Sequence, residues 1–267
     1  MSPLVLARPD RSRLCRAMNT GEFRLAYQAQ ISDDGSGLCG FEALLRWCSP
    51  VYGNVSPGEF IPLAEETGLI DALGRYALSQ SLSDYRALAR LSRKPVHVAV
   101  NVSPLQLAAP HFAAEVLGLL QEAELPARVL HLEVTESTLF MGSDHTVGNI
   151  QTLADAGVEL WIDDFGTGYS SLTRMRDLPV SGLKIDQTFV KRLESSQSDF
   201  RIVCAIIAMA HSLHLRVVAE GVEQESHLRI LEGLGCNRMQ GYLIGRPMGL
   251  NELTRTWHQA AAVPQRA

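Results

Sequence analysis

The stretch "LWIDDFGTGYSSL", residues 160–172, places two aspartates directly after a run of apolar residues and follows them with glycines. The apolar run is typical of a buried strand, so Asp163 and Asp164 stand where that strand ends. Two neighbouring carboxylates repel each other, and the pair costs stability unless a cation or a proton lies between them. Gly166 and Gly168 allow the following loop to fold tightly over whatever the aspartates bind.

Strand-like runs of this kind recur along the chain, and from the second run on they alternate with helical patterns. Such alternation predicts a mostly parallel sheet, and roughly eight units in 267 residues favour closure into a barrel over an open sheet. Only the turn-rich residues 31–38 separate the first two runs, which is too few for a crossover helix, so we expect an antiparallel hairpin there. The predicted fold is therefore α/β, a modified TIM (β/α)8 barrel with an antiparallel first strand. The expected strands are 23–30, 39–47, 96–103, 129–136, 158–165, 182–186, 215–221 and 237–242.

Helical periodicity fills the segments between these strands. No linker, charge block or low-complexity tract interrupts the alternation, so residues 21–262 are predicted to form one barrel domain. Residues 1–20, which carry several arginines, are interpreted as an N-terminal linker or tether helix. The expected helices are one opening at Pro57, then 70–92, 110–123, 144–156, 188–213 with a break near 195–198, 224–234 and 250–261.

The composition excludes several classes of protein. A formal net charge of -5 argues against binding to DNA or RNA polymers, which would require a basic face. The five cysteines are scattered without a CxxC pair, which predicts reduced thiols and a cytoplasmic setting. The most apolar stretch, residues 200–210, is too short to span a bilayer, so we expect no membrane contact by this domain, although a longer parent protein could be membrane-anchored.

Polar residues stand at the carboxyl ends of the predicted strands, the end at which barrels of this type carry their functional groups. A single acid at such a position is most often a helix cap or a solvated charge, but here the pattern recurs from strand to strand. Five carboxylates converging without cations would raise their own pKa values and resist folding at neutral pH. The candidates at these ends are Asn101, Glu133, Asp163, Asp164, Lys184, Glu220 and Gln240, and Glu42 is a further candidate that lies within the second strand and projects from its face.

Hard oxygen donors of this kind suit Mg²⁺ or Mn²⁺, and the lack of a nearby Cys or His argues against zinc. The adjacent Asp163 and Asp164 suggest two ions bridged by one carboxylate, because paired sites lie about 3.5–4 Å apart. Such a pair promotes in-line displacement at phosphorus, with Lys184 beside the attacking water. Enolase-like proton abstraction next to a carboxylate is the alternative, but the chain offers no second candidate base.

The ordered motifs of the chain resemble those of the EAL-domain phosphodiesterases that hydrolyse cyclic di-GMP. The resemblance runs from about Phe23 to Met248, and so many motifs in order make it specific. It implies a barrel with an antiparallel first strand, in agreement with the predicted hairpin. The motifs are "YQAQ", "FEALLRW", "PGEFIPLAEETGLI", "VAVNVS", "LEVTES", "DDFGTGYSSL", "LKIDQTFV", "VVAEGVE" and "MQGYLIGRP".

The resemblance also implies roles for individual residues. The positions matching Glu42, Asn101, Glu133 and Asp163 hold one metal ion in the family, and those matching Asp163, Asp164 and Glu220 hold the second. Lys184 matches the lysine that contacts the nucleophilic water, and Gln240 lies next to it. The acid matching Glu136 holds the glycine loop that contains Gly166, Thr167 and Gly168. Residues implied in substrate binding are Gln28, Glu42, Leu45, Arg46, Asn101, Asp186, Glu223 and Gln240.

The function that the resemblance implies is hydrolysis of cyclic di-GMP to linear pGpG by a two-metal mechanism. Calcium is expected to bind without supporting turnover. A catalytically weak cyclic di-GMP receptor is the second hypothesis. It ranks below hydrolysis because non-catalytic receptors of the family lose metal ligands or the glycine loop, whereas this chain keeps both. A homodimer and an upstream sensory or GGDEF module are the expected partners.

Overall fold

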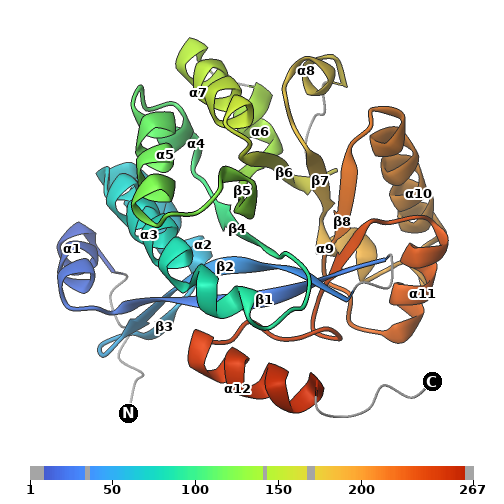
Figure 1. Ribbon diagram of the computed structural model, residues 1–267, viewed down its shortest axis with the longest axis horizontal. Helices are drawn as coiled ribbons and strands as arrows, with labels where there is room; N and C mark the ends of the chain where they lie inside the picture. The colour runs from blue at the N-terminus through green and yellow to red at the C-terminus, as the bar shows by residue number, and fades with distance from the viewer. Residues whose placement is uncertain (1–8, 34–36, 141–142, 167–171, 262–267) are drawn as a thin grey trace, which may run out of the picture.

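The computed structural model describes residues 9–33, 37–140, 143–166 and 172–261. These residues form a single sheet in which β1 pairs with both β2 and β9, so eight strands close into a barrel and β3 extends β2 at one edge. Figure 1 shows the strands at the centre of the molecule with helices around them. The strands are β1 (Phe23–Ser32), β2 (Gly37–Ser49), β3 (Gly53–Val55), β4 (His97–Asn101), β5 (Leu130–Thr135), β6 (Glu159–Phe165), β7 (Gly182–Ile185), β8 (Arg216–Ala219) and β9 (Arg238–Gln240).

The antiparallel first strand is confirmed. β1 runs antiparallel to β2 and to β9, whereas the pairs from β2–β4 round to β8–β9 are parallel. The parallel strands therefore bring their carboxyl ends to one mouth of the barrel, which is the arrangement that the sequence predicted.

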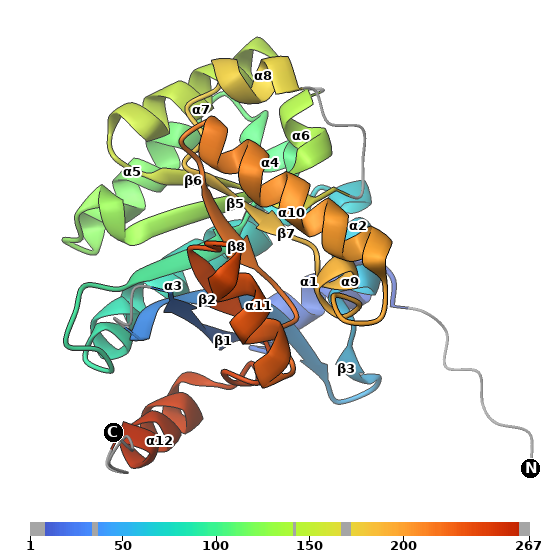
Figure 2. The same ribbon diagram turned by 90° about the vertical axis from the view of Figure 1, so that its right-hand side faces the viewer.

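The described helices cover the outside of the barrel, as the turned view in Figure 2 shows for α10 and α11. The expected break in the long helix is present, because α9 and α10 are separated by residues 191–196. The helices are α1 (Arg11–Asn19), α2 (Pro57–Thr67), α3 (Ile70–Ala89), α4 (Pro104–Leu107), α5 (Phe112–Glu122), η1 (Ala127–Val129), α6 (Glu136–Phe140), α7 (Asp144–Asp155), α8 (Leu172–Asp177), α9 (Gln187–Val190), α10 (Gln197–Ser212), α11 (Glu225–Gly233) and α12 (Leu250–Ala261).

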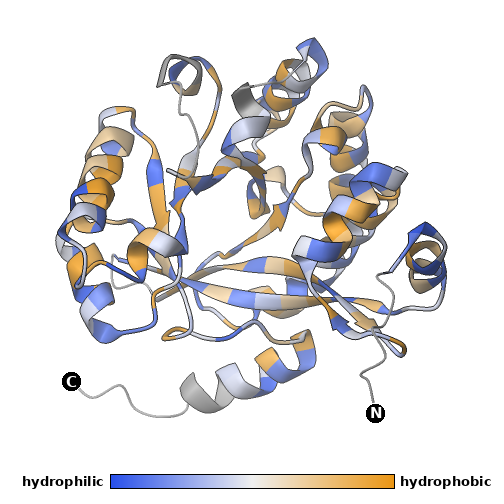
Figure 3. Cartoon of the chain, turned by 180° about the vertical axis from the view of Figure 1, so that it is seen from behind, coloured by the Kyte–Doolittle hydropathy of each residue, from blue (hydrophilic) through white to orange (hydrophobic). Residues whose placement is uncertain are grey.

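The hydrophobic core lies between the strands and the helices that cover them. Hydrophobic and hydrophilic residues alternate along both kinds of element (Figure 3), as expected for helices and strands with one buried side. A second, smaller cluster lies beside the barrel, where Leu14 and Ala17 of α1 are fully buried with Trp47 and Phe60. None of the helices in the described ranges is both long and apolar enough to cross a membrane.

The end of β6 departs from regular strand geometry. The pairing of β6 with β7 shifts register between Ile162 and Phe165, and Asp164 has a φ of 53°. In a regular strand neighbouring side chains point to opposite faces, so Asp163 and Asp164 would be separated. The irregularity, with Asp164 in the left-handed region that aspartate tolerates, brings both carboxylates to the barrel mouth.

Candidate active site

Lys184 lies at the centre of the acidic residues. It projects from β7, its side chain is 1% exposed, and its Nζ atom is within ion-pair distance of four carboxylates. These contacts are 2.6 Å to Glu220, 2.7 Å to Glu133, 3.2 Å to Asp163 and 3.4 Å to Glu42. One ammonium therefore serves as the counter-charge for acids that lie in or directly after four different strands, and the convergence predicted from the sequence is present.

Glu42 is held through both of its carboxylate oxygens. The Nδ2 group of Asn101 donates to Oε1 at 2.8 Å, and the Nε2 group of Gln240 donates to Oε2 at 2.5 Å. Gln240 also donates to Gln28 Oε1 at 3.0 Å, and Gln28 donates to the carbonyl of Gly245 at 3.0 Å. These hydrogen bonds fix the direction in which the Glu42 carboxylate faces the mouth.

Asp163, Asp164 and Glu220 form a second group at the same mouth. Each offers one carboxylate oxygen, and these oxygens all lie within 4.8 Å of one another. An all-oxygen set of this kind fits a hard divalent cation, so these residues could hold a metal ion.

The pKa values show that the acids oppose one another when no cation is bound. Burial raises the pKa of Glu220 to about 8 although the charge of Lys184 lowers it, and repulsion from Asp163 and Glu42 adds to the effect of burial. Burial and repulsion from Asp163 raise the pKa of Asp164 to about 6. A divalent cation between these carboxylates would remove the repulsion.

Glu42 and Glu133 differ although both are buried. For Glu42 burial would raise the pKa, but Lys184 and the hydrogen bonds from Gln240 and Asn101 lower it. For Glu133 burial and repulsion from Glu42 raise the pKa well above its usual range. Burial alone would lower the pKa of Lys184, but the surrounding acids raise it, so Lys184 stays charged.

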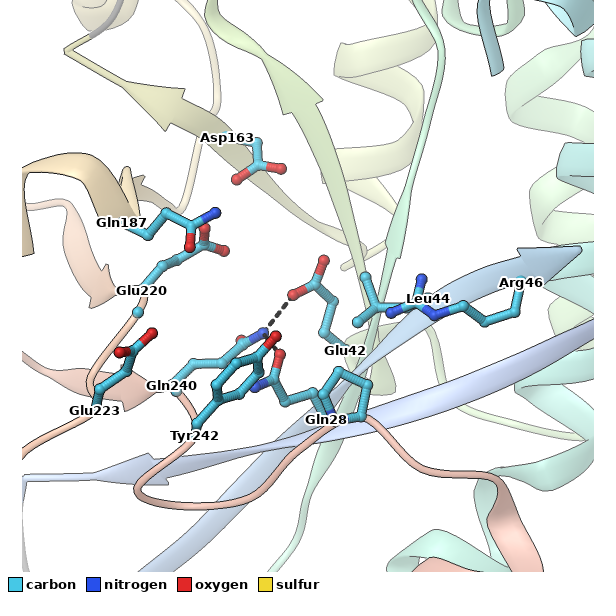
Figure 4. Close-up of a pocket in the computed structure, with 13 residues that line it drawn as sticks. Gln28, Glu42, Leu44, Arg46, Asp163, Gln187, Glu220, Glu223, Gln240 and Tyr242 are labelled. Carbon is cyan, nitrogen blue, oxygen red and sulfur yellow. Dashed lines mark hydrogen bonds between the residues drawn. The ribbon is translucent and has the colours of Figure 1, made fainter. Parts of the chain in front are cut away.

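A cleft of about 230 Å³ opens directly over these groups. Figure 4 shows the carboxylates of Glu42, Asp163 and Glu220 pointing into the same space, with Arg46 and Tyr242 at the rim. A larger groove of about 830 Å³ adjoins the cleft, and the two share Arg46 and Pro247. The cleft and the groove together therefore offer space for a ligand larger than the cleft alone could hold.

Some of the residues predicted to bind substrate line the cleft, and others do not. Gln28, Arg46 and Glu223 line the cleft, and Glu223 pairs with Lys191 at 3.1 Å. Leu45 does not line it: alternation along β2 turns Leu45 away from the face that carries Glu42, Leu44 and Arg46, and Leu45 packs against the hydrophobic core instead.

Asp186 lies away from the cleft lining. It is the N-cap of α9, where its side chain accepts hydrogen bonds from the backbone N–H and the hydroxyl of Thr188. The structure therefore accounts for Asp186 as a helix cap beside the site, close enough to Asp164 to contribute to the raised pKa of that residue.

The glycine loop is described only at its first residue. The Gly166 N–H donates to Glu136 Oε2 at 3.4 Å, and Gly166 has a φ of 100°, which favours glycine. Thr167 and Gly168, also predicted as loop-stabilising, lie outside the described residues.

Two polar side chains that line the cleft, Gln187 and Tyr242, were not predicted from the sequence. Gln187 lies two residues beyond the end of β7 at Ile185, and Tyr242 lies two residues beyond the end of β9 at Gln240. The strand-end rule that found the other residues, extended by two positions into each loop, would have included both.

Comparison with known proteins identifies the family. The family model described as "EAL domain" matches residues 11–247. The chain belongs to the EAL domain family. The match covers nearly all of the barrel described above, including every strand end that carries a candidate residue.

Named relatives agree with this assignment. The chain is 41% identical over 240 residues to the bifunctional diguanylate cyclase/cyclic di-GMP phosphodiesterase MucR of Pseudomonas aeruginosa, covering 90% of this chain and 35% of MucR. It is 37% identical over 241 residues to the cyclic di-GMP phosphodiesterase RocR of the same organism, covering 90% of this chain and 61% of RocR. The EAL chain thus spans about a third of the length of the first curated relatives that it matches.

Solved structures confirm the fold. The EAL chain superposes on the PaMucR phosphodiesterase in complex with c-di-GMP with a TM-score of 0.86 and 40% identity, covering 91% of this chain and 98% of that one. It also superposes on the FimX EAL domain of P. aeruginosa bound to c-di-GMP, with a TM-score of 0.78 and 27% identity, covering 88% of this chain and 94% of that one.

Proposed function

We propose that this EAL domain is a phosphodiesterase that hydrolyses cyclic di-GMP to linear pGpG and requires two divalent ions, Mg²⁺ or Mn²⁺. The observation that carries the proposal is the convergence of four buried or half-buried carboxylates on Lys184 at the floor of a cleft. The names of the relatives and the c-di-GMP complex of PaMucR support the choice of substrate.

The chemistry of the oxygen donors fits two ions. Glu42, Asn101, Glu133 and Asp163 would hold the first, and Asp163, Asp164 and Glu220 the second, with Asp163 shared between them. Two such ions, when bound, supply an activated water and stabilisation of the leaving oxygen in phosphodiester cleavage. Carboxylates whose pKa values are raised in the ion-free site gain most from this neutralisation.

The chain's own residues would position the reactants. Lys184, with its ammonium among the acids, would orient the water that attacks phosphorus and stabilise its negative form. Arg46 at the junction of the cleft and the groove would bind a phosphate, because within the described part of the chain its guanidinium donates only to the carbonyl of Leu45. Gln28, Gln240 and Glu223 border the same space, and Glu136 would hold the glycine loop over it.

The test measures the product of cyclic di-GMP with purified protein in Mg²⁺, Mn²⁺ or Ca²⁺. Linear pGpG is expected with Mg²⁺ or Mn²⁺, and ligand binding without product is expected with Ca²⁺. Glu220→Gln should lower turnover at least ~100-fold, since even partners that only support a ligand cost up to that factor. Glu232→Gln, on the exposed side of α11, is the matched control and should retain activity.

The receptor hypothesis predicts a different result. Tight binding of cyclic di-GMP in Ca²⁺ with no linear product in Mg²⁺ or Mn²⁺ would overturn the proposed hydrolysis and make this domain a binding module. We also propose a homodimer and an upstream regulatory module, the latter because the named relatives are longer than this chain. Sedimentation of the purified protein tests the dimer.

A further inference from the structure

A line of hydrogen bonds runs through the barrel interior below the acidic residues. His97 Nε2 lies 2.8 Å from Gln30 Oε1, Gln30 Nε2 donates to Gln240 Oε1 at 2.7 Å, and Gln240 Nε2 donates to Glu42 Oε2 at 2.5 Å. All four side chains are at most 5% exposed. The line therefore connects the base of the barrel to a carboxylate of the active site without passing through bulk water.

The strand register builds this line. Gln30 and Gln240 are direct partners across β1 and β9, and Gly40 lies opposite both Gln30 and His97. A Cβ atom on Gly40 would meet the His97 ring at 2.1–2.5 Å, so only glycine leaves room for that ring. The close approach of the imidazole to Gln30 thus depends on the missing side chain at residue 40.

The hydrogen bonds can point in only one direction. An ionised carboxylate only accepts, so the amide nitrogen of Gln240 must face Glu42 and its oxygen must face Gln30. Gln30 then donates to Gln240 and has only its oxygen left to accept from His97. Burial, His131 and Arg238 lower the pKa of His97 well below its usual range, so the ring is neutral. A donor for Gln30 Oε1 then requires the single N–H of the ring on Nε2, a nitrogen that Arg238 Nη1 also approaches at 3.4 Å.

We infer that Gln30 and His97 are positioning residues for the metal site, acting through Gln240 to fix the orientation of the Glu42 carboxylate. Neither touches the cleft, so each acts only through the next amide. The inference rests on the proposed function in so far as Glu42 is a metal ligand. Partners that orient metal ligands change metal affinity or activity by about 10–100-fold when they are removed.

The test compares Gln30→Met, which keeps the length of the side chain but removes both hydrogen bonds, with the wild type. Calorimetric titration with Mn²⁺ should show metal affinity reduced by ~10-fold, and kcat should fall by a similar factor with KM for cyclic di-GMP changed little. His97→Leu should have the same effect, whereas His97→Gln, which keeps an N–H donor, should recover most of the loss.

The control for loss of a buried amide is Asn149→Leu. Asn149 is 6% exposed and donates at 2.8 Å to the carbonyls of Leu107 and Ala109, far from Glu42 in the fold. This variant should lose stability while keeping wild-type Mn²⁺ affinity. Wild-type Mn²⁺ affinity in Gln30→Met or His97→Leu would overturn the inference, whereas a wild type without turnover would overturn only the proposed function.

Discussion

At the scale of single residues, Lys184 explains how this acidic site folds before any cation binds. Its ammonium contacts four carboxylates, of which Glu133 has a pKa raised well above its usual range and Glu220 a pKa raised to about 8. The lysine thus stabilises the ion-free protein, and the same central position suits it to hold a water during the reaction. A residue with both roles should show both effects when it is replaced.

Lys184→Met is expected to lower the free energy of unfolding of the metal-free protein by about 3–5 kcal/mol, because it leaves buried carboxylates without a partner. Mn²⁺ should restore more stability to this variant than to the wild type, since the ions replace the lost positive charge, while turnover stays low. Chemical denaturation with and without Mn²⁺ measures both effects.

Lys191→Met is the matched control. Lys191 pairs with Glu223 at the surface, where both side chains are about two-fifths exposed, so its loss should cost at most about 1 kcal/mol. Equal unfolding free energies for the metal-free wild type and Lys184→Met would contradict the role of Lys184 as counter-charge.

The strand-end rule found Asn101, Lys184, Gln240 and every one of the converging acids except Glu42 from the sequence, because parallel strands must end at one mouth; Glu42 was found from its place within the second strand. It could not find the irregularity at Asp164 or the roles of Gln30 and His97, because these depend on how particular strands pair. That Leu44 lines the cleft and Leu45 does not could have been predicted from the sequence. Side chains alternate between the two faces of a strand, so Leu44 and Arg46 share the face of Glu42.

At the scale of elements, the loop after β9 is held against the loop after β8 by a close backbone approach. Gly241 lies where a Cβ atom would meet the backbone of Val222 at 2.1–2.6 Å. The N–H of Val222 donates to the carbonyl of Gln240, and the carbonyl of Val222 accepts from the N–H of Leu243. Because Glu220 and Gln240 flank this contact, the distance between the two loops sets the spacing of their side chains.

Gly241→Ala should therefore destabilise the protein by about 1–3 kcal/mol or more and lower turnover, because the added methyl group forces the two loops apart. Gly118→Ala is the matched control: Gly118 is inside α5 with no atom within 4 Å of its added Cβ, so the substitution should stabilise by up to about 1 kcal/mol without changing activity. Thermal unfolding and product formation, measured on both variants, separate the two effects. Wild-type activity in Gly241→Ala would show that the loop spacing does not control the site.

The longer elements could be predicted because periodicity needs length to be visible. The helices over 70–89, 112–122, 144–155 and 225–233 lie within two or three residues of the expected bounds. The short elements β3, α4, α6 and α8 were not predicted. They are only three to six residues long, which is too short for the periodic pattern of a helix or a strand to be visible in the sequence.

At the scale of the whole molecule, the barrel has two polar ends of opposite character. The mouth collects carboxylates around one lysine, whereas the base holds a stack of His97, His131 and Trp161 with two arginines, Arg216 and Arg238, over the indole. The mouth could be predicted from the sequence because functional groups are expected at the carboxyl ends of the strands, whereas no such rule applies to the base, where the same strands begin.

Titration of His131 at the base changes the free energy of unfolding with pH in the direction opposite to titration of the acids at the mouth. Burial lowers the pKa of His131 from 6.5 to about 4, and this effect prevails over the hydrogen bond and charge of Glu159, 2.9 Å away, which raise the pKa. Repulsion from Arg238 and Arg216 adds a smaller lowering effect. Because the folded-state pKa is below the unfolded value, the unfolded chain binds the proton first as pH falls. Stability that is complete above about pH 6.5 is therefore lost progressively down to about pH 4. The raised pKa values of Asp164 and Glu220 at the mouth have the opposite effect in the metal-free protein, because they make the free energy of unfolding rise as pH falls. The contribution of His131 must therefore be measured by comparing variants.

His131→Gln removes this titration while leaving the mouth unchanged. Between pH 7 and pH 5 the wild type should lose about 2 kcal/mol more unfolding free energy than this variant, as follows from a pKa shift of this size. His145→Gln, the same substitution at an exposed histidine of α7, should follow the wild type across this range. Urea denaturation at both pH values gives the comparison. Parallel losses in the wild type and His131→Gln would mean that the imidazole is already charged in the folded barrel, and that Glu159 outweighs the burial and the two arginines.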